Sequence, residues 1–197
     1  MEPAGIVLDL GSMTLPLASR ELFGSDVPLE VELGVGKGLF LLDWAVAHPD
    51  VGFLGVERVR KYMKVAALRA ARRNLPNVRL VHTTAEDLLF RCLAGGSLAA
   101  AHVYFPDPWP KKRHQKRRFF RPANVARLAD VLGPGGLLRV KTDHEEYASM
   151  IRDVLAAEPS LSPVAAEAAF DGLPVTNFEV KYARENRQVH RFAYRRV

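Results

Sequence analysis

Short apolar runs alternate with stretches of helical length along most of the chain, and this alternation constrains the fold more than any other feature. Strands are expected at residues 29–33, 51–56, 78–82, 98–105 and 137–141. Helices are expected between them, at residues 38–47, 58–74, 86–93, 119–132 and 144–157. Strands that alternate with helices form a parallel sheet covered on both faces, which predicts an open, doubly wound, Rossmann-like α/β layer.

The last forty residues depart from this pattern. The segments around 161–170 and 188–196 are β-type, so the sheet is expected to close with an antiparallel edge. A turn is expected at 133–136, where the sequence is GPGG. No linker separates a second domain, so residues 1–197 are expected to form one domain in which 1–28 are an N-terminal extension.

Composition excludes several classes of protein. The single Cys92 cannot form an internal disulfide or a cysteine-rich zinc site, which is typical of a reducing compartment. The six histidines are scattered along the chain, so no metal site is expected. The first twelve residues lack the basic stretch of a signal peptide, and the apolar run at 98–105 is too short to span a bilayer. We therefore expect a cytoplasmic protein without a membrane partner.

Basic residues are concentrated in two segments, although the formal net charge is only +6. Residues 110–121 hold seven Lys and Arg and no acid, and residues 181–197 hold six against Glu185. The remainder has 15 bases and 21 acids, so the basic segments indicate a polyanionic partner. Trp109, Phe119 and Phe120 favour RNA, because exposed bases stack on aromatic rings; a solvated surface is the alternative. The candidate RNA contacts are Lys112, Arg113, His114, Lys116, Arg117 and Arg118. Residues 1–28 are interpreted as a lid or a further RNA-contacting segment.

A glycine-rich turn follows the first of the expected parallel strands, where an open α/β sheet binds its cofactor. Gly34, Gly36 and Gly38 let the backbone approach a ligand closely, and Glu57 ends the next strand, where it can accept hydrogen bonds from ribose hydroxyls. Dinucleotide enzymes prefer G-x-G-x-x-G, whereas this chain has G-x-G-x-G with Glu32 two residues ahead. A carboxylate there repels a pyrophosphate but suits a cofactor with ammonium and sulfonium cations. S-adenosylmethionine therefore fits better than a nicotinamide cofactor.

The most specific stretch of the chain is FPDPWPKKRHQKRR, at residues 105–118. Asp107 stands at the carboxyl end of an expected core strand, in line with the cofactor crevice, and three prolines fix the backbone around it. A carboxylate that only caps backbone N–H groups in a turn is the alternative interpretation of Asp107.

These residues resemble the bacterial tRNA (guanine-N7)-methyltransferase family. The family's E-x-G-x-G-x-G matches 32–38, its acid after the second strand matches Glu57, and its PDPWPKxRHxKRR matches 106–118. Its T-D followed by Y matches Thr142, Asp143 and Tyr147, and its T-x-F-E matches 176–179. The motifs occur in the family's order.

The resemblance implies a class I methyltransferase fold that transfers the methyl group of S-adenosylmethionine to guanine N7 in the variable loop of tRNA, leaving S-adenosylhomocysteine. Guanine N7 carries no proton, so positioning is expected to supply most of the rate. A carboxylate that accepts the guanine N1 and N2 protons would orient the base, and either Asp107 or Glu179 could do this. The cofactor residues implied are Glu32, Gly34, Gly36, Gly38, Glu57, Thr84, Ala85 and Asp107. The guanine-pocket residues implied are Lys111, Asp143, Thr176, Asn177, Phe178 and Glu179, with Asp107 as the catalytic residue.

The sequence departs from the family where Thr84 precedes Ala85, because the family usually has an acidic or amide residue there. Asp143 could instead cap the helix expected from His144, and Tyr147 and Phe178 could be core residues. A nicotinamide-dependent oxidoreductase and a non-catalytic RNA-binding protein remain the alternative functions. A monomer and a homodimer are both compatible with the sequence.

Overall fold

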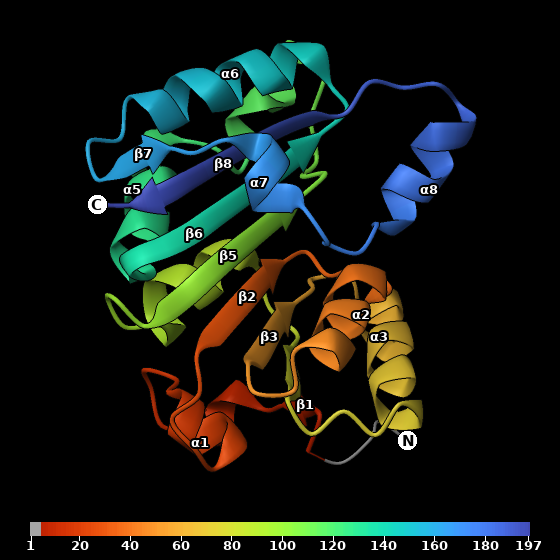
Figure 1. The fold of residues 1–197 in the computed structure, drawn as a ribbon, viewed down its shortest axis with the longest axis vertical. Coiled ribbons are helices and arrows are strands. Elements are labelled where there is room, and N and C mark those ends of the chain that lie inside the picture. Colours follow the sequence, from red (N-terminus) through yellow and green to blue (C-terminus); the bar gives the residue numbers. More distant parts are fainter. Residues whose placement is uncertain (1–4) are drawn as a thin grey trace.

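The computed structural model describes residues 5–197 and contains one mixed sheet in the order β1-β4-β3-β2-β5-β6-β8-β7 (Figure 1). Its strands are β1 (Val7–Leu8), β2 (Leu29–Leu33), β3 (Gly52–Val56), β4 (Val78–Val81), β5 (Leu98–Tyr104), β6 (Leu132–Thr142), β7 (Leu161–Pro163) and β8 (His190–Arg196). Strands β1 to β6 pair in parallel, whereas β8 is antiparallel to both β6 and β7. The predicted parallel sheet with an antiparallel C-terminal edge is confirmed.

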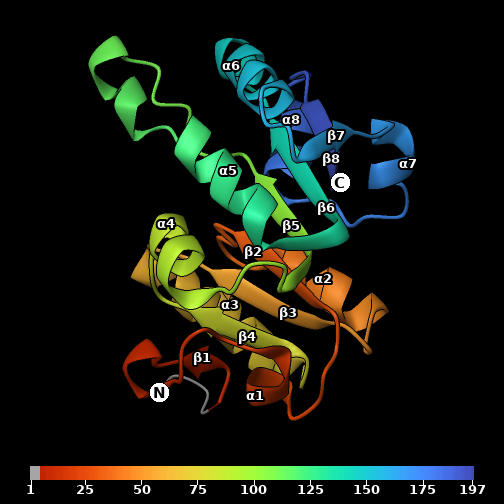
Figure 2. The same cartoon turned by 90° about the vertical axis from the view of Figure 1, so that its left-hand side faces the viewer.

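Helices cover both faces of this sheet, because each face of the buried strands is apolar. The α-helices are α1 (Ser19–Phe23), α2 (Leu39–Ala47), α3 (Arg60–Arg72), α4 (Ala85–Asp87), α5 (Pro122–Val131), α6 (Glu145–Ala156), α7 (Ala166–Phe170) and α8 (Asn177–Arg184). Apolar residues of α2 and α3 form one core cluster with β3 and β4, and those of α5 and α6 belong to a second, larger cluster. Figure 2 shows α4 and α5 on one side of the sheet and α2 and α7 on the other.

Shorter elements connect these helices. Helix α4 continues into the π-helical turn η2 (Leu88–Cys92), and the 3-10 helix η3 (Lys112–Arg117) lies inside the basic segment after β5. The expected turn at 133–136 is instead the first part of β6, where the pairing with β5 is irregular between Leu98 and Ala100. None of the helices formed by residues 5–197 has the length and hydrophobicity needed to cross a lipid bilayer.

The N-terminal extension is part of the fold, as far as residues 5–28 show; residues 1–4 lie outside the described part. Strand β1 adds to β4 at the edge of the sheet, and the 3-10 helix η1 (Leu10–Ser12) leads on to α1. Leu17 and Leu22 are buried in the larger core cluster. A free lid would leave these leucines exposed, so the interpretation of this segment as a lid is wrong for the residues around them.

The C-terminal region is more helical than predicted. Of the β-type segment expected at 161–170, only β7 is a strand, and α7 occupies the rest. Helix α8 has no counterpart among the expected elements, although the strand expected at 188–196 is confirmed as β8. Figure 1 shows that α8 stands apart from the sheet, beside the ends toward which the arrows of β5 and β6 point. The carboxyl ends of the parallel strands meet at this edge, where α/β sheets bind ligands.

Candidate active site at the carboxyl edge of the sheet

The turn between β2 and α2 is built from three glycines in the left-handed backbone region. Gly34 has φ 86°, Gly36 has φ 54° and Gly38 has φ 78°, conformations that side chains with a Cβ adopt at a cost. A Cβ on Gly34 or Gly36 would meet no atom within 4 Å, so the space beside them is open to a ligand. A Cβ on Gly38 would lie 3.1 Å from the Cβ of Ala66, so the absence of a side chain at Gly38 also serves the packing of the turn on α3.

Glu57 holds this turn in place. One carboxylate oxygen accepts the N–H of Gly36 at 2.9 Å, and the other accepts the N–H of Val59 at 2.7 Å. The side chain is buried, so the glycine turn is tied to the end of β3 by bonds that water does not compete for. Each oxygen retains a second lone pair, which is what the predicted contact with ribose hydroxyls requires.

Glu32 is the most unusual group at this edge. It is 4% exposed, and its Oε2 has no hydrogen-bond partner among the described residues. Burial, reinforced by the nearby Glu57 carboxylate, raises the pKa of Glu32 to about 8, although the backbone N–H of Leu41 opposes the rise. An unpartnered buried carboxylate is costly unless a cation or a donor reaches it. A cationic ligand group beside the glycine turn would supply one.

Thr84 and Ala85 lie where β4 gives way to α4. The hydroxyl oxygen of Thr84 accepts the N–H of Asp87 at 3.1 Å and so caps this helix. Thr84 is exposed and Ala85 is half-buried, which leaves the hydroxyl proton and the backbone available to a ligand.

The loop after β5 presents Asp107 to solvent. Its side chain is 57% exposed, and the nearest cation is Arg58, with an Nη2 to Oδ2 distance of 3.8 Å. Phe105 and Trp109, on either side of Asp107, have positive φ values of 52° and 42°, which is strained for residues with a bulky Cβ substituent. Strain of this kind concentrates at functional sites. Since no backbone N–H bonds to the carboxylate of Asp107 among the hydrogen bonds found in residues 5–197, it does not act as a turn cap.

The basic segment, residues 110–121, is mostly solvent-exposed, but not uniformly. Lys111, Lys112, Arg113, Lys116 and Arg117 are exposed, and Arg117 stacks over Trp109 at 5.0 Å from the ring centre. Figure 2 shows η3 projecting away from the body of the protein above α5. His114 is half-buried against Trp109, with the ring centres 5.7 Å apart.

Arg118 is a correction to the sequence prediction, because it does not face solvent. It is 2% exposed, its Nε donates to the carbonyl of Pro108 at 2.7 Å, and its Nη2 lies 3.3 Å from a carboxylate oxygen of Glu146. The guanidinium also lies over the Tyr147 ring at 4.9 Å. Arg118 therefore fastens the loop to α6 and is not placed to contact a phosphate. Tyr147 is fully buried, which confirms its interpretation as a core residue.

Helix α8 carries the Thr176–Glu179 motif, and this motif begins the helix. The Thr176 hydroxyl accepts the N–H of Glu179 at 3.1 Å, and the Glu179 carboxylate accepts the N–H of Thr176 at 2.9 Å, forming a capping box. Lys141 of β6 donates to the same carboxylate at 2.9 Å and lies over the Tyr104 ring at 4.8 Å. Burial alone would raise the pKa of Glu179, but these donors outweigh it and hold the pKa below its usual value.

The remaining predicted guanine-pocket residues lie around this helix. Asp143 pairs with Arg187 at 2.9 Å, and the cap of α6 is His144, whose Nδ1 accepts the N–H of Tyr147; the alternative role of Asp143 as the cap is wrong. Asn177 is exposed. Phe178 is 46% exposed, with its ring centre 5.4 Å from that of Phe105, so it is not a core residue.

Sequence reasoning missed Arg58 and Lys141. Arg58 follows Glu57 directly, and its place at the end of a strand was a usable signal. The T-x-x-E spacing of 176–179 is also a capping-box pattern and could have predicted α8. Lys141 gave no such signal, because its partner Glu179 is 38 residues away.

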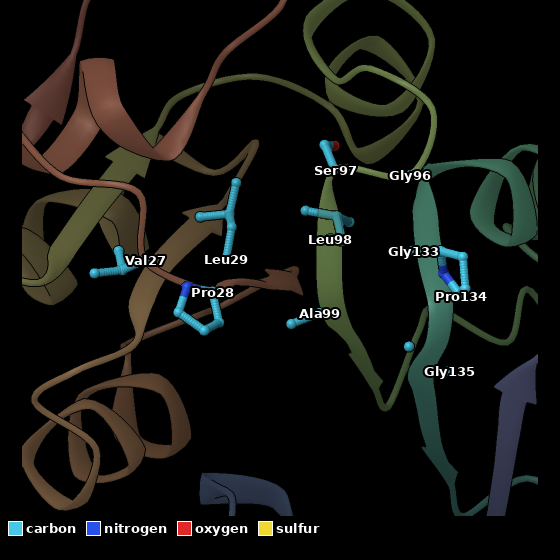
Figure 3. A pocket seen from close by; sticks show the side chains of 11 residues that line it. Val27, Pro28, Leu29, Gly96, Ser97, Leu98, Ala99, Gly133, Pro134 and Gly135 are labelled. Atoms are coloured by element: carbon cyan, nitrogen blue, oxygen red, sulfur yellow. The ribbon is translucent and has the colours of Figure 1, made fainter.

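A hollow of about 380 Å³ lies at the opposite edge of the sheet, where β2, β5 and β6 begin (Figure 3). Its wall consists of short or apolar side chains and backbone, including Pro28, Ser97 and Pro134, and contains no charged residue. The chemistry-bearing residues therefore meet at the carboxyl edge, away from this hollow.

Comparison with solved structures shows that this mostly parallel α/β sheet is shared with known methyltransferases. The aminoglycoside resistance methyltransferase NpmB1 superposes with a TM-score of 0.61 at 18% identity, covering 92% of this chain and 95% of that one. The 16S rRNA methyltransferase KamB gives 0.61 at 17% identity, covering 97% and 98%. At these identities the likeness shows the fold alone, which is the Rossmann-like fold of class I methyltransferases.

Sequence comparison is more specific. The family described as "Putative methyltransferase" matches residues 26–192. The tRNA (guanine-N(7)-)-methyltransferase of Bordetella pertussis is 39% identical over 195 residues, which is 95% of this chain and 77% of that protein. That of Mycobacterium avium is 41% identical over 169 residues, and the match covers 84% of this chain and 65% of that protein. The chain belongs to the bacterial tRNA (guanine-N7)-methyltransferase family.

Proposed function

We propose that this protein transfers the methyl group of S-adenosylmethionine to N7 of a guanine in the variable loop of tRNA. The observation that carries the proposal is that two different carboxylates lie at the same edge of the sheet. Glu32 is buried without a partner for its Oε2 beside the open glycine turn, and Asp107 is exposed in a strained loop. The first suits a cationic cofactor and the second a base that offers N–H groups. Family membership supplies the identity of the base and of the RNA.

The cofactor residues fit S-adenosylmethionine. The free oxygen of Glu32 can accept an ammonium group, the open space beside Gly34 and Gly36 admits a ligand against the backbone, and Glu57 has lone pairs for ribose hydroxyls. Thr84 and Ala85 lie at the end of the neighbouring strand, where adenine contacts are expected. When bound, S-adenosylmethionine supplies an electrophilic methyl group on a sulfonium.

The chain's own task is to orient the guanine. N7 is a lone pair without a proton, so no general base is needed, and a fixed in-line approach supplies much of the acceleration. A carboxylate that accepts the N1 and N2 protons also stabilises the positive charge that develops on the ring. Asp107 is the better candidate, because both oxygens of Glu179 are already engaged by Lys141, Thr176 and Arg191.

Exposure supports the proposed guanine-pocket role of Lys111 and the proposed RNA role of the basic segment. Lys111, Lys112, Arg113, Lys116 and Arg117 are exposed along a projecting segment. A positively charged projection can follow a phosphate backbone, which supplies affinity rather than base selection. Arg118 is left out of this set because it is buried.

The test is nucleoside mass spectrometry of tRNA incubated with the protein and S-adenosylmethionine, with N7-methylguanosine as the expected product. Asp107→Asn should lower the single-turnover rate about 30- to 1000-fold, the loss of roughly 2–4 kcal/mol of transition-state stabilisation. Binding of tRNA, spread over many phosphates, should change little. Asp153→Asn, on the exposed surface of α6, is the matched control and should transfer at the wild-type rate. Wild-type turnover by Asp107→Asn would exclude Asp107 as the orienting group.

A further inference from the structure

Helix α3 and its flanks form the most basic surface of the protein outside the two segments already described. Residues 58–74 contain seven Lys and Arg and no acid. The apolar side of α3 is buried on the sheet through Met63, Ala66, Ala67 and Ala70, so the bases occupy its outer side. The seven basic residues are Arg58, Arg60, Lys61, Lys64, Arg69, Arg72 and Arg73.

Three of these bases have partners. Arg73 pairs with Asp43 at 2.5 Å, Arg69 donates to the carbonyl of Lys37 at 2.9 Å, and Arg58 lies 3.8 Å from Asp107. The other four are exposed and make no ion pair within residues 5–197. We call these four the α3 ridge: Arg60, Lys61, Lys64 and Arg72.

The α3 ridge lowers the stability of its own helix. At 3.6 residues per turn its members fall within about 120° of the circumference, so they share one side. Arg60 and Lys64 are four residues apart and Lys61 and Lys64 three apart, spacings at which like charges repel by a few tenths of a kcal/mol. No ion pair within residues 5–197 offsets this repulsion. A polyanion bound along the helix would.

The α3 ridge also leads directly out of the candidate active site. Helix α3 begins just beyond Glu57, and Lys61 and Arg72 are separated by about 16 Å along its axis. Figure 1 shows α3 running from the carboxyl edge back along the sheet, below α8. It packs in the core cluster of α2, whereas η3 leads into α5 in the cluster on the other face. The α3 ridge and the basic segment therefore flank the crevice from opposite faces of the sheet.

We propose that the α3 ridge is a second RNA-docking surface, which binds the sugar–phosphate backbone of the substrate tRNA beyond the nucleotide that enters the crevice. This rests on the proposed function only for the identity of the RNA. Charge complementarity supports it, since outside α3 and the two basic segments acids outnumber bases. Continuity supports it too, because Arg58 links the start of α3 to Asp107. Two basic surfaces across the crevice would hold the RNA on both sides of the target.

The test neutralises three of the four bases of the α3 ridge without breaking the helix. The variant combines Lys61→Gln, Lys64→Gln and Arg72→Gln. Glutamine has a good helix propensity, so α3 and the fold should persist. Filter binding of unmodified tRNA across a KCl series should show a dissociation constant about tenfold higher near 0.1 M salt. The slope of log affinity against log salt should fall by up to about 0.9 for each phosphate that the variant no longer neutralises. Affinity for S-adenosylmethionine and the single-turnover rate at saturating tRNA should remain within twofold of wild type.

The matched control removes the same charge elsewhere. The control variant carries Arg20→Gln, Arg91→Gln and Arg152→Gln. These change three exposed arginines on α1, η2 and α6, outside α3 and the two basic segments, and should leave tRNA affinity within twofold. An unchanged dissociation constant and salt slope in the α3 variant would overturn the proposal. An equally large loss of affinity in the control variant would also overturn it, because the effect would then come from net charge and not from the α3 ridge. Loss of binding to phosphatidylserine vesicles with tRNA binding unchanged would assign the surface to membranes instead. This experiment measures binding and is therefore independent of methyl transfer. If the wild-type protein formed no N7-methylguanosine, that result would refute the proposed function but not the docking surface.

Discussion

The buried Glu32 carboxylate predicts a specific pH dependence of stability in the cofactor-free protein. Its pKa is about 8 in the folded chain against 4.5 in a free glutamate. Between these values the folded protein holds a proton that the unfolded chain has lost, so the free energy of unfolding falls as the pH rises from 4.5 to 8. At 1.36 kcal/mol per pH unit, the full difference is at most about 5 kcal/mol.

Glu32→Gln isolates this effect, because glutamine has a similar shape and does not titrate. Urea unfolding at pH 5.5, 6.5 and 7.5 should show the wild type losing about 1.4 kcal/mol per pH unit relative to the variant. Glu30→Gln is the control on the same strand. Burial alone would raise the pKa of Glu30, but His102 and Trp44 outweigh it and hold the pKa below its usual value. Glu30→Gln should therefore lower the free energy of unfolding near neutral pH, whereas Glu32→Gln should raise it relative to wild type as the pH increases.

The pH dependence of cofactor binding gives a second measurement of the raised pKa of Glu32. Only ionised Glu32 pairs with an ammonium group, so S-adenosylmethionine should bind about tenfold more tightly for each pH unit gained below 8. Close to one proton should be released per cofactor at pH 7, measured by calorimetry in buffers of different ionisation enthalpy. Parallel urea curves for wild type and Glu32→Gln, with no proton release on binding, would refute the reasoning.

Two further substitutions test the contacts that position the site. Lys141→Met removes the cation that pairs with the half-buried Glu179. It should lower the free energy of unfolding by about 2–3 kcal/mol and speed tryptic cleavage of α8, whereas Lys141→Arg should retain much of the stability and of the protection from trypsin. Protection of α8 in Lys141→Met would contradict this. Arg118→Gln should lower the melting temperature by several degrees and weaken tRNA binding less than the joint neutralisation of Lys112, Lys116 and Arg117. An effect on binding without a loss of stability would return Arg118 to the RNA surface.

The sequence was sufficient for most of the sheet because β3 and β5 are nearly continuous apolar runs, and β2 and β4 are short, mainly apolar segments between helical stretches. Adjacent residues such as Phe53 and Leu54 of β3 are both buried but belong to different core clusters, which is what a strand covered on both faces predicts. Helix α8 escaped prediction because the last forty residues have a β-type pattern on either side of it. The T-x-x-E pattern at Thr176 matches a family motif, and the same spacing also satisfies the start of a helix.

The side-chain roles could be predicted only where they depend on local position. Glu32, Glu57 and Asp107 lie near or just beyond the carboxyl ends of parallel strands, so their meeting at one edge follows from topology. Arg118 was misplaced because a run of bases does not reveal which member turns inward, and its partner Glu146 is 28 residues away. Gly38 matched the motif, but only the position of Ala66 shows that it serves packing.

The acids at this edge differ in what a ligand would have to displace. Glu179 is already ionised against Lys141 and capped by Thr176, so engaging a guanine would break two bonds in a half-buried setting. Glu32 has a free oxygen but lies inside the glycine turn, within reach of a group that enters there. Asp107 is exposed, with one cation 3.8 Å away, and it can exchange water for a base at little cost. We infer from these differences that, in the proposed function, Glu32 binds the ammonium group of the cofactor, Glu179 holds α8 in place, and Asp107 is free to contact the guanine.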